Sequence, residues 1–332
     1  MLAAELSGVN QKLEIIEVPN PKLENGEVLV QIKAAALNHR DNWIRKGKYA
    51  GLKFPIILGS DGAGIVVEAF NDEDQHWIGK EVIINPSMNW GDNDNFQGPE
   101  FEILGLPNNG TFAQFVKVKA TQLFLKPNHL SFEQSAAFPL AGLTAFRALF
   151  TKANLQPKEK VLIAGVGGGA ATFAMLWAIN AGAQVFVTSS SDEKIKQALT
   201  LGAKGGVNYK TEGWADEIKS LSNGIDVIID SALGDGFEQH FKYTNPGARI
   251  VFFGATAGDL PSLNPRIIFW KQIQILGTTM GNAKEFEAMV EFINKHKIIP
   301  VVDEVFKLND INDAFLAMEN AKQFGKIVLS ID

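Results

Sequence analysis

The chain of 332 residues contains no cysteine. It therefore forms no disulfide, offers no thiolate to a zinc ion and has no cysteine nucleophile. An excess of basic residues is also missing, since 31 Lys and Arg stand against 37 Asp and Glu and give a net charge of −6. Nucleic acids and anionic membrane surfaces attract a basic face, so this balance argues against either as the main partner.

Long apolar runs are absent as well. Pro139 and Arg147 interrupt the longest candidate, residues 136–150, so we expect no segment that spans a bilayer. Residues 1–6 show neither the basic region nor the apolar core of a secretion signal, and we expect a cytoplasmic protein. The 46% of hydrophobic residues are sufficient for the cores of two ordinary domains.

A short apolar strand, residues 161–164, runs into a glycine-rich turn near the middle of the chain. A nearly all-apolar helix over residues 168–181 and a second strand over 185–188 follow it. This order is typical of a dinucleotide-binding unit, in which the helix N-terminus faces a pyrophosphate. A structural glycine turn without a nucleotide is the alternative. The pattern predicts coenzyme contacts at Gly165, Gly167, Gly168, Gly169 and Ala170.

The end of the second strand indicates which coenzyme is preferred. A protein that binds NAD commonly places Asp or Glu there to hold the ribose 2′-hydroxyl. This chain has Ser189 and Ser190 instead, with Lys194 one helical turn further on. Hydroxyls and an ammonium accept a 2′-phosphate that an acid would repel, so we predict NADP(H). Two structural interpretations remain: Ser190 and Glu193 form a capping box for a helix over 192–201, and Lys194 is a solvated helix lysine.

The chain changes character along its length. Its first part reads as short strands separated by Gly, Pro and Asn, which is typical of a small barrel-like β domain. These strands are expected at 28–32, 64–68, 81–84 and 113–118, and the long polar segment 86–110 shows no regular period. From residue 158 strands alternate with helices, as in a doubly wound parallel sheet. Those strands are expected at 161–164, 185–188, 207–209, 227–230, 249–254 and 273–276, followed by a helix over 310–323 and a strand over 326–330. The predicted fold class is α/β.

Several motifs occur in a fixed order: residues 35–41 (AALNHRD), 58–64 (LGSDGAG), 110–113 (GTFA), 142–145 (GLTA), 230–231 (DS) and 325–326 (GK). With the glycine turn, they make the chain resemble the medium-chain dehydrogenase/reductase superfamily over essentially its whole length. The resemblance implies a GroES-like catalytic domain (1–126), a Rossmann NADP(H)-binding domain (127–275) with a cleft between them, and a segment (276–332) that completes the Rossmann sheet and returns to the first domain. It also implies a homodimer joined through the Rossmann domains.

The chain departs from the zinc-dependent members of that superfamily at two positions. Asn38 stands where they carry a Cys ligand, and Ser60 stands where they carry a His ligand. The segment 86–110 resembles their structural-zinc lobe without its cysteines. The sequence is closer to the quinone and enone reductase branch, which is similar in lacking zinc and using NADPH.

Chemistry without a metal favours particular acceptors. Hydride transfer to a quinone or an enone spreads negative charge over a conjugated system, which hydrogen-bond donors can stabilise. The candidate catalytic residues are Asn38, His39, Arg40, Tyr49, Ser60 and Thr144. By resemblance, Asn38 and Tyr49 contact the substrate oxygen and Thr144 contacts the nicotinamide edge. Strand ends add Asp230, Ser231, Gly254 and Thr256 to the coenzyme contacts, and the resemblance adds Tyr209, Gly325 and Lys326.

Each of these interpretations has a competitor. Asn38 is also suited to satisfy a turn, His39 to a surface role, and Asp61 to a turn carboxylate. A metal held by His39 and Asp61 has only two ligands and is not expected. The other histidines have no partner motif and are expected to be surface or structural: His76, His129, His240 and His296. Besides an NADPH-dependent reductase of quinones or unsaturated carbonyls, the sequence allows a zinc-free alcohol or aldehyde dehydrogenase and a non-catalytic NADPH-binding redox sensor.

Overall fold

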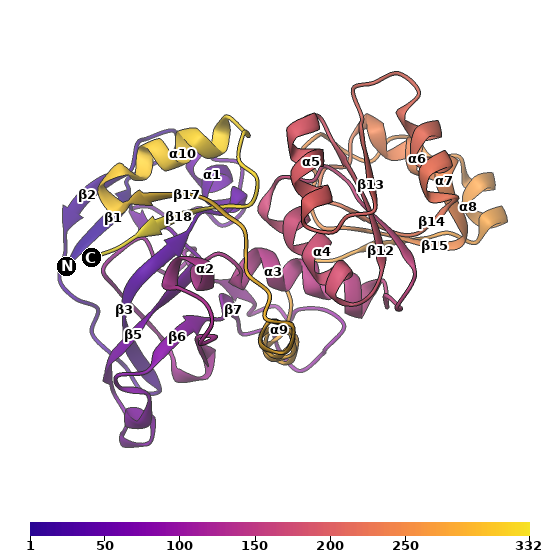
Figure 1. The fold of residues 1–332 in the computed structure, drawn as a ribbon. Coiled ribbons are helices and arrows are strands. Elements are labelled where there is room, and N and C mark those ends of the chain that lie inside the picture. The colour runs from indigo at the N-terminus through magenta and orange to yellow at the C-terminus, as the bar shows by residue number, and fades with distance from the viewer. The chain divides into compact units, whose positions relative to one another are not determined.

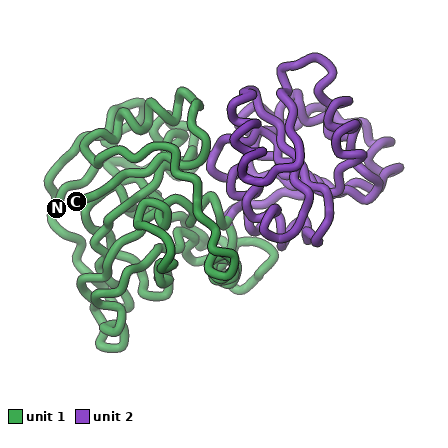
Figure 2. The backbone as a smooth tube through the Cα atoms, viewed as in Figure 1, with its two compact units in different colours: residues 1–143, 281–332 green, residues 144–280 purple.

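The computed structural model describes residues 1–332, which form two compact units (Figure 2). Unit 1 combines Met1–Leu143 with Gly281–Asp332, and unit 2 is Thr144–Met280. The structural boundaries thus fall at 143/144 and 280/281 instead of 126/127 and 275/276. No helix of the chain is both long and apolar enough to cross a membrane.

Unit 1 is built on a seven-stranded sheet in the order β10-β6-β5-β3-β18-β17, with β9 also paired to β3. Its strands are β3 (Glu27–Ala36), β5 (Asp61–Ala69), β6 (Glu81–Ile84), β9 (Phe115–Lys119), β10 (Leu123–Leu125), β17 (Val302–Lys307) and β18 (Lys326–Ser330). A three-stranded sheet has the order β2-β1-β4, from β1 (Leu2–Leu6), β2 (Glu14–Glu17) and β4 (Ile56–Ile57). Both chain ends lie side by side in this unit (Figure 1), where Gln114 bonds to Leu2 and to Asp332.

The helices of unit 1 are mostly short. They are α1 (His39–Arg45), η1 (Asp72–Trp77), η2 (Ala120–Gln122), α2 (Phe132–Ala136), α9 (Ala283–His296), η5 (Leu308–Asp310) and α10 (Ile311–Glu319), and α3 (Pro139–Phe146) crosses into unit 2. The apolar face of α10 packs on β17 and β18 and joins the main core through Ile311, Ala314 and Phe315. The segment 86–110 contains one short antiparallel pair, β7 (Ser87–Met88) with β8 (Glu102–Ile103).

Unit 2 is a parallel sheet of six strands in the order β13-β12-β11-β14-β15-β16. The strands are β11 (Lys160–Ile163), β12 (Gln184–Ser189), β13 (Gly205–Asn208), β14 (Ile225–Asp230), β15 (Thr244–Phe252) and β16 (Gln274–Gly277). The helices are η3 (Arg147–Lys152), α4 (Gly169–Asn180), α5 (Asp192–Thr200), α6 (Trp214–Ser222), η4 (Asp235–Gln239), α7 (His240–Tyr243) and α8 (Pro265–Lys271). In Figure 1, α4 and α5 lie on one side of the sheet and α6, α7 and α8 on the other. Strand order reverses between β11 and β14, where open α/β sheets bind ligands.

Most expected elements are present, with two corrections. Ser191, not Ser190, is the N-cap of α5, and its side chain accepts a hydrogen bond from the Lys194 amide, so the predicted Ser190/Glu193 capping box is wrong. The helix expected over 310–323 is interrupted earlier, because α10 ends at Glu319 and Ala321 adopts a φ of 52°.

Candidate active site

The glycine turn of unit 2 joins β11 to α4. Gly165 (φ 67°) and Gly167 (φ 133°) adopt conformations that a side chain would strain. The turn is held on the end of β12, because Thr188 Oγ1 accepts from the Gly165 amide at 3.1 Å and the Thr188 carbonyl accepts from the Val166 amide at 2.7 Å. Gly168 caps α4 without a side chain, so the first amides of a twelve-residue helix face outward at this turn. The five predicted contacts, Gly165 to Ala170, lie together here.

The Lys194 side chain lies across this turn. A methyl group placed on Gly167 would lie 2.7 Å from Lys194 Cδ and 3.1 Å from Lys194 Nζ. Ser189 is buried and its hydroxyl donates to the Val166 carbonyl at 3.2 Å, while Ser190 is half-buried beside it. The Lys194 ammonium therefore lies beside the glycine turn, which its sequence position alone did not establish.

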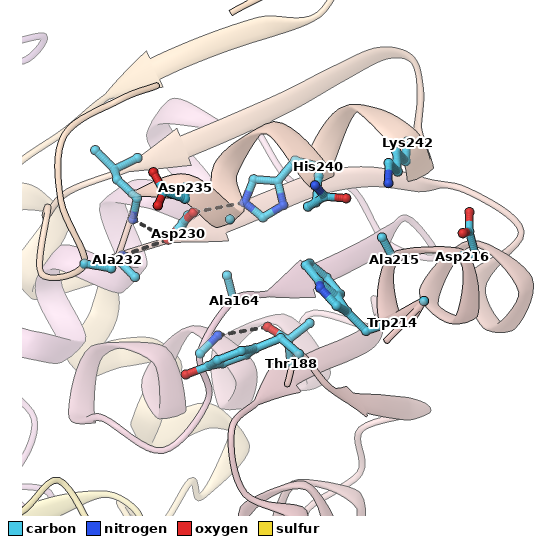
Figure 3. A pocket seen from close by; sticks show the side chains of 17 residues that line it. Ala164, Thr188, Trp214, Ala215, Asp216, Asp230, Ala232, Asp235, His240 and Lys242 are labelled. Atoms are coloured by element: carbon cyan, nitrogen blue, oxygen red, sulfur yellow. Dashed lines mark hydrogen bonds and ion pairs between the residues drawn. The ribbon is translucent and has the colours of Figure 1, made fainter. Parts of the chain in front are cut away.

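A pocket of about 640 Å³ opens at the carboxyl ends of β11 to β14 (Figure 3). Its size is within the ~300–1,000 Å³ of ligand pockets. The residues that line it include Thr188, Tyr209, Trp214, Asp230, Leu233 and His240. Ser231, Gly254 and Thr256 follow the neighbouring strand ends, with Thr256 Oγ1 donating to the Ser231 carbonyl at 3.5 Å.

Asp230 ends β14 and is buried in the pocket wall. Its Oδ1 accepts from the amides of Ala232 (2.7 Å) and Leu233 (3.1 Å), and its Oδ2 lies 2.9 Å from His240 Nε2. His240 Nδ1 lies 2.6 Å from the Tyr243 hydroxyl. Burial raises the pKa of Asp230, but the hydrogen bond and charge of His240 and the two amides outweigh it and lower the pKa below its ordinary value.

In unit 1, Asn38, Asp61 and Lys326 form a buried cluster. Lys326 Nζ donates to Asn38 Oδ1 at 2.7 Å and to Asp61 Oδ2 at 3.0 Å. Asn38 Nδ2 donates to Asp61 Oδ2 at 2.9 Å, and the Leu140 amide donates to Asp61 Oδ1 at 2.7 Å. Burial raises the pKa of Asp61, and Lys326 opposes that effect. The structure thus places Lys326 with the catalytic candidates. Gly325, whose φ is 112°, allows the close approach of the Val301 carbonyl just before β18.

Arg40 points from α1 into a second buried group. Its Nη1 donates to Ser60 Oγ at 2.7 Å and to the Leu104 carbonyl at 2.9 Å, and Ser60 Oγ donates to that same carbonyl at 2.7 Å. Arg40 Nε lies 3.4 Å from the hydroxyl of half-buried Tyr49, and the guanidinium carbon lies 5.1 Å from the Tyr49 ring centre. Four of the five donors on the guanidinium are thereby used within unit 1, counting the long bond from Nη2 to Leu106 at 3.5 Å.

Two ionisable residues flank these groups on α1. Asp41 is completely buried, its Oδ2 accepts from the Asn38 amide at 2.8 Å, and its Oδ1 has no hydrogen-bond partner. Burial raises the pKa of Asp41 to about 6, although Arg40 and the Asn38 amide act against this. The His39 ring reaches solvent, yet desolvation by surrounding protein and then the Lys326 ammonium lower its pKa below 6.5.

Comparison with known proteins is informative over nearly the whole chain. The family model described as "Zinc-binding dehydrogenase" matches residues 167–295, and the model described as "Alcohol dehydrogenase GroES-like domain" matches residues 24–128. A zinc-type alcohol dehydrogenase-like protein of Leptosphaeria maculans is 37% identical over 341 residues, covering 96% of this chain and 94% of its own. A similar protein of Schizosaccharomyces pombe is 37% identical over 339 residues, covering 99% and 97%. A solved structure described as NAD-dependent alcohol dehydrogenase matches with a TM-score of 0.92 at 34% identity, covering 100% of both chains.

The chain belongs to the medium-chain dehydrogenase/reductase superfamily. It is an oxidoreductase of that superfamily, whose members bind a nicotinamide coenzyme and act on small molecules. The resemblance seen in the sequence and the predicted fold class, a GroES-like domain with a Rossmann domain, are both confirmed.

The residues at the zinc position of this superfamily do not fit the metal. Asn38 Oδ1 already accepts from the Lys326 ammonium, and Ser60 Oγ accepts from the Arg40 guanidinium. Two cations therefore lie against the side chains that replace the Cys and His ligands, and zinc needs thiolate, imidazole or carboxylate donors. Both oxygens of Asp61 are also engaged, and no three His, Asp or Glu side chains are grouped for a metal.

The structure gathers the predicted residues into three places and leaves one apart. Asn38 and Lys326 share one group, and Arg40, Tyr49 and Ser60 share another, whereas the coenzyme candidates of unit 2 lie at the glycine turn and at the neighbouring strand ends. Thr144 lies in unit 2, where its hydroxyl is 3.8 Å from Met280 Sδ. Sequence reasoning missed the importance of Asp61, taken as a turn carboxylate, and of His240, taken as a histidine without a partner. Their partners are distant in sequence or lack a motif.

Proposed function

We propose that the protein is an NADPH-dependent reductase of quinones or α,β-unsaturated carbonyl compounds that needs no zinc. The observation that carries the proposal is the replacement of both zinc ligands by side chains bonded to buried cations, Asn38 to Lys326 and Ser60 to Arg40. Fixed donors stabilise charge that is delocalised over a conjugated acceptor more readily than the localised charge of an alkoxide.

Unit 2 has the features needed to hold the coenzyme, which when bound supplies a hydride. The outward amides at the start of α4 suit the pyrophosphate, and the Lys194 ammonium beside Gly167 suits the 2′-phosphate. The end of β12 offers Ser189 and Ser190 and no acid, so nothing there repels that phosphate. These features favour NADPH, although the solved relative is described as NAD-dependent.

Tyr49 is the donor best suited to the substrate oxygen. Because Arg40 Nε donates to the Tyr49 oxygen, the hydroxyl proton points elsewhere, and the adjacent guanidinium strengthens the hydroxyl as a donor. Arg40 itself is largely engaged with Ser60 and the Leu104 carbonyl, so it orients and polarises Tyr49. Asn38 keeps one amide proton beyond its bond to Asp61 and serves as a second donor.

The test is a substrate panel with matched variants. Stopped-flow oxidation of NADPH is followed with quinones, enones and aldehydes, and reduction of NADP⁺ with alcohols. We expect turnover with the first two classes, unchanged by chelators and without stoichiometric zinc in the purified protein. Tyr49→Phe should lower kcat/KM by about 100-fold, the effect of losing one donor to a developing oxyanion, with NADPH affinity retained. Stoichiometric zinc that activity requires would refute the proposal.

Two rivals give different outcomes in the same panel. The relatives are described as alcohol dehydrogenases or alcohol dehydrogenase-like. An alcohol or aldehyde dehydrogenase that works without zinc predicts turnover confined to alcohols and aldehydes. A non-catalytic NADPH-binding redox sensor predicts tight coenzyme binding with no turnover in any class.

We also propose that the protein is a homodimer formed through unit 2. In this unit β16 is an edge strand, and the neighbouring Trp270 is 83% exposed. Light scattering tests the oligomeric state.

A further inference from the structure

We propose that His240 is a positioning residue of the nucleotide pocket: held between Asp230 and Tyr243, it fixes the turn after β14 and thereby sets the affinity for the adenosine half of the coenzyme. This inference rests on the proposed function, because it takes the ligand of the pocket to be a dinucleotide. His240 touches neither hydride donor nor acceptor in this assignment.

The turn after β14 has a conformation that its sequence does not favour by itself. Leu233 has a φ of 53° and Gly234 a φ of 72°, and a methyl group on Gly234 would lie 2.7 Å from the Ala257 carbonyl. Such a conformation persists only when its surroundings determine it. Here Asp230 Oδ1 accepts from the amides of Ala232 and Leu233, at 2.7 and 3.1 Å, and so closes the turn.

His240 holds the other oxygen of the same carboxylate. Asp230 is ionised and has no proton to donate, so His240 Nε2 donates to Oδ2 across 2.9 Å (Figure 3). Tyr243 keeps its hydroxyl proton, because burial and then the charge of Asp230 raise its pKa well above 10. Its hydroxyl lies 2.6 Å from Nδ1, so a second hydrogen bond holds the imidazole from its other side.

The chain of bonds is part of the pocket wall. Asp230, Leu233 and His240 line the pocket directly, and the Tyr243 ring lies 6.0 Å from the ring of Trp214, which also lines it. Thr188 on β12 and Tyr209 after β13 line the same pocket. In a Rossmann sheet, the end of the strand that follows the glycine turn and its helix, here β12, lies beside the ribose of adenosine. The conformation of the turn after β14 therefore affects binding of the adenosine half of the ligand.

Removing His240 would leave one oxygen of a buried carboxylate without a donor. The loss is that of one charge-assisted hydrogen bond. It lowers either the stability of the turn or the affinity for a ligand that binds only when the turn is formed. His240→Leu removes the donor at similar size, His240→Gln places an amide donor near the position of Nε2, and Tyr243→Phe removes only the hydroxyl. His296→Leu, at a half-buried histidine of α9 in unit 1, is the control.

The experiment measures Kd for 2′,5′-ADP by calorimetry, and kcat and KM for NADPH, on the full chain. We expect His240→Leu to raise Kd and KM by about tenfold with kcat at saturation retained, and His240→Gln to recover most of the loss. Reduced nicotinamide mononucleotide, which lacks adenosine, should support turnover in His240→Leu within about twofold of wild type, and His296→Leu should change nothing.

Unchanged 2′,5′-ADP affinity in folded His240→Leu, or equal loss for both coenzyme halves, would overturn the inference. If that variant does not fold, Tyr243→Phe with ¹⁵N-labelled histidine decides: the His240 ring resonances should differ from those of the wild type, and 2′,5′-ADP should bind more weakly. A wild-type protein that binds no 2′,5′-ADP overturns the proposed coenzyme as well, whereas wild-type binding with indifferent variants overturns only the role of His240.

Discussion

Asp41→Asn should change how the stability of the protein depends on pH. The Asp41 carboxyl is completely buried and burial raises its pKa from 3.8 to about 6. When the pKa of an acid is higher in the folded state than in the unfolded state, its protonated form stabilises the fold. This contribution is complete at a pH below the unfolded-state pKa and is lost as the pH rises through the folded-state pKa. The two pKa values of Asp41 differ by roughly two, which at ~1.36 kcal/mol per pKa unit corresponds to about 3 kcal/mol of unfolding free energy. The wild type loses this stability between about pH 4 and pH 6.

The asparagine does not titrate, so the difference in unfolding free energy between the variant and wild type should move in favour of the variant by up to about 3 kcal/mol from pH 4 to pH 7. Its oxygen can still accept from the Asn38 amide, whereas its Nδ2 would face the position of Oδ1, which has no partner. That second effect costs about 1–3 kcal/mol at every pH and leaves the slope unchanged.

Urea unfolding at a series of pH values, followed by near-ultraviolet circular dichroism, measures this difference. Asp259→Asn, at an exposed carboxylate, is the control and should give a flat difference within about 0.5 kcal/mol. A flat difference for Asp41→Asn as well would refute the reasoning, because it would show that the buried carboxyl titrates as it does in the unfolded chain.

Three other substitutions test the two sites. Lys194→Met should bring the Kd for NADPH close to that for NADH, whereas Lys196→Met, at an exposed lysine of the same helix, should leave the ratio unchanged; calorimetry measures both. Lys326→Met leaves the buried Asp61 carboxylate without its cation and should lower the free energy of unfolding by about 3–5 kcal/mol, with an equally stable variant counting against the pair. Gly167→Ala places a methyl group 2.7 Å from Lys194 Cδ at a φ of 133°, so coenzyme affinity should fall at least tenfold, and unaltered binding would show that the turn is not the phosphate site.

The elements that could be predicted from the sequence are those with strong local signals. The glycine turn and α4 follow from an apolar strand, glycines and a nearly continuous apolar helix, and β18 has the predicted bounds, Lys326–Ser330. The errors occur where local signals compete. Successive serines can each cap a helix, so local sequence did not decide between Ser190 and Ser191. The last helix ends at Glu319, with a positive φ at Ala321, instead of continuing to residue 323.

The contacts that define the candidate site are not local. Lys326 bonds to Asn38 and Asp61 across separations of 288 and 265 residues, which no motif spacing reveals. His240 lies only ten residues from Asp230, yet no periodic pattern marks the pair, because the turn after β14 alone brings them together. The side chains that replace the zinc ligands are evident from the sequence, whereas the cations that bond to them can be identified only from the folded structure.

The position of β18 has a consequence for how the site is completed during synthesis. This strand is inserted between β3 and β17 and begins with the lysine whose ammonium neutralises a carboxylate on β5. Translation proceeds from the N-terminus, so the ribosome releases that carboxylate 265 residues before its counter-ion. Until then the nascent sheet lacks the strand that joins β17 to β3 and contains an uncompensated charge, and a chain halted in between would carry unit 2 without a finished unit 1.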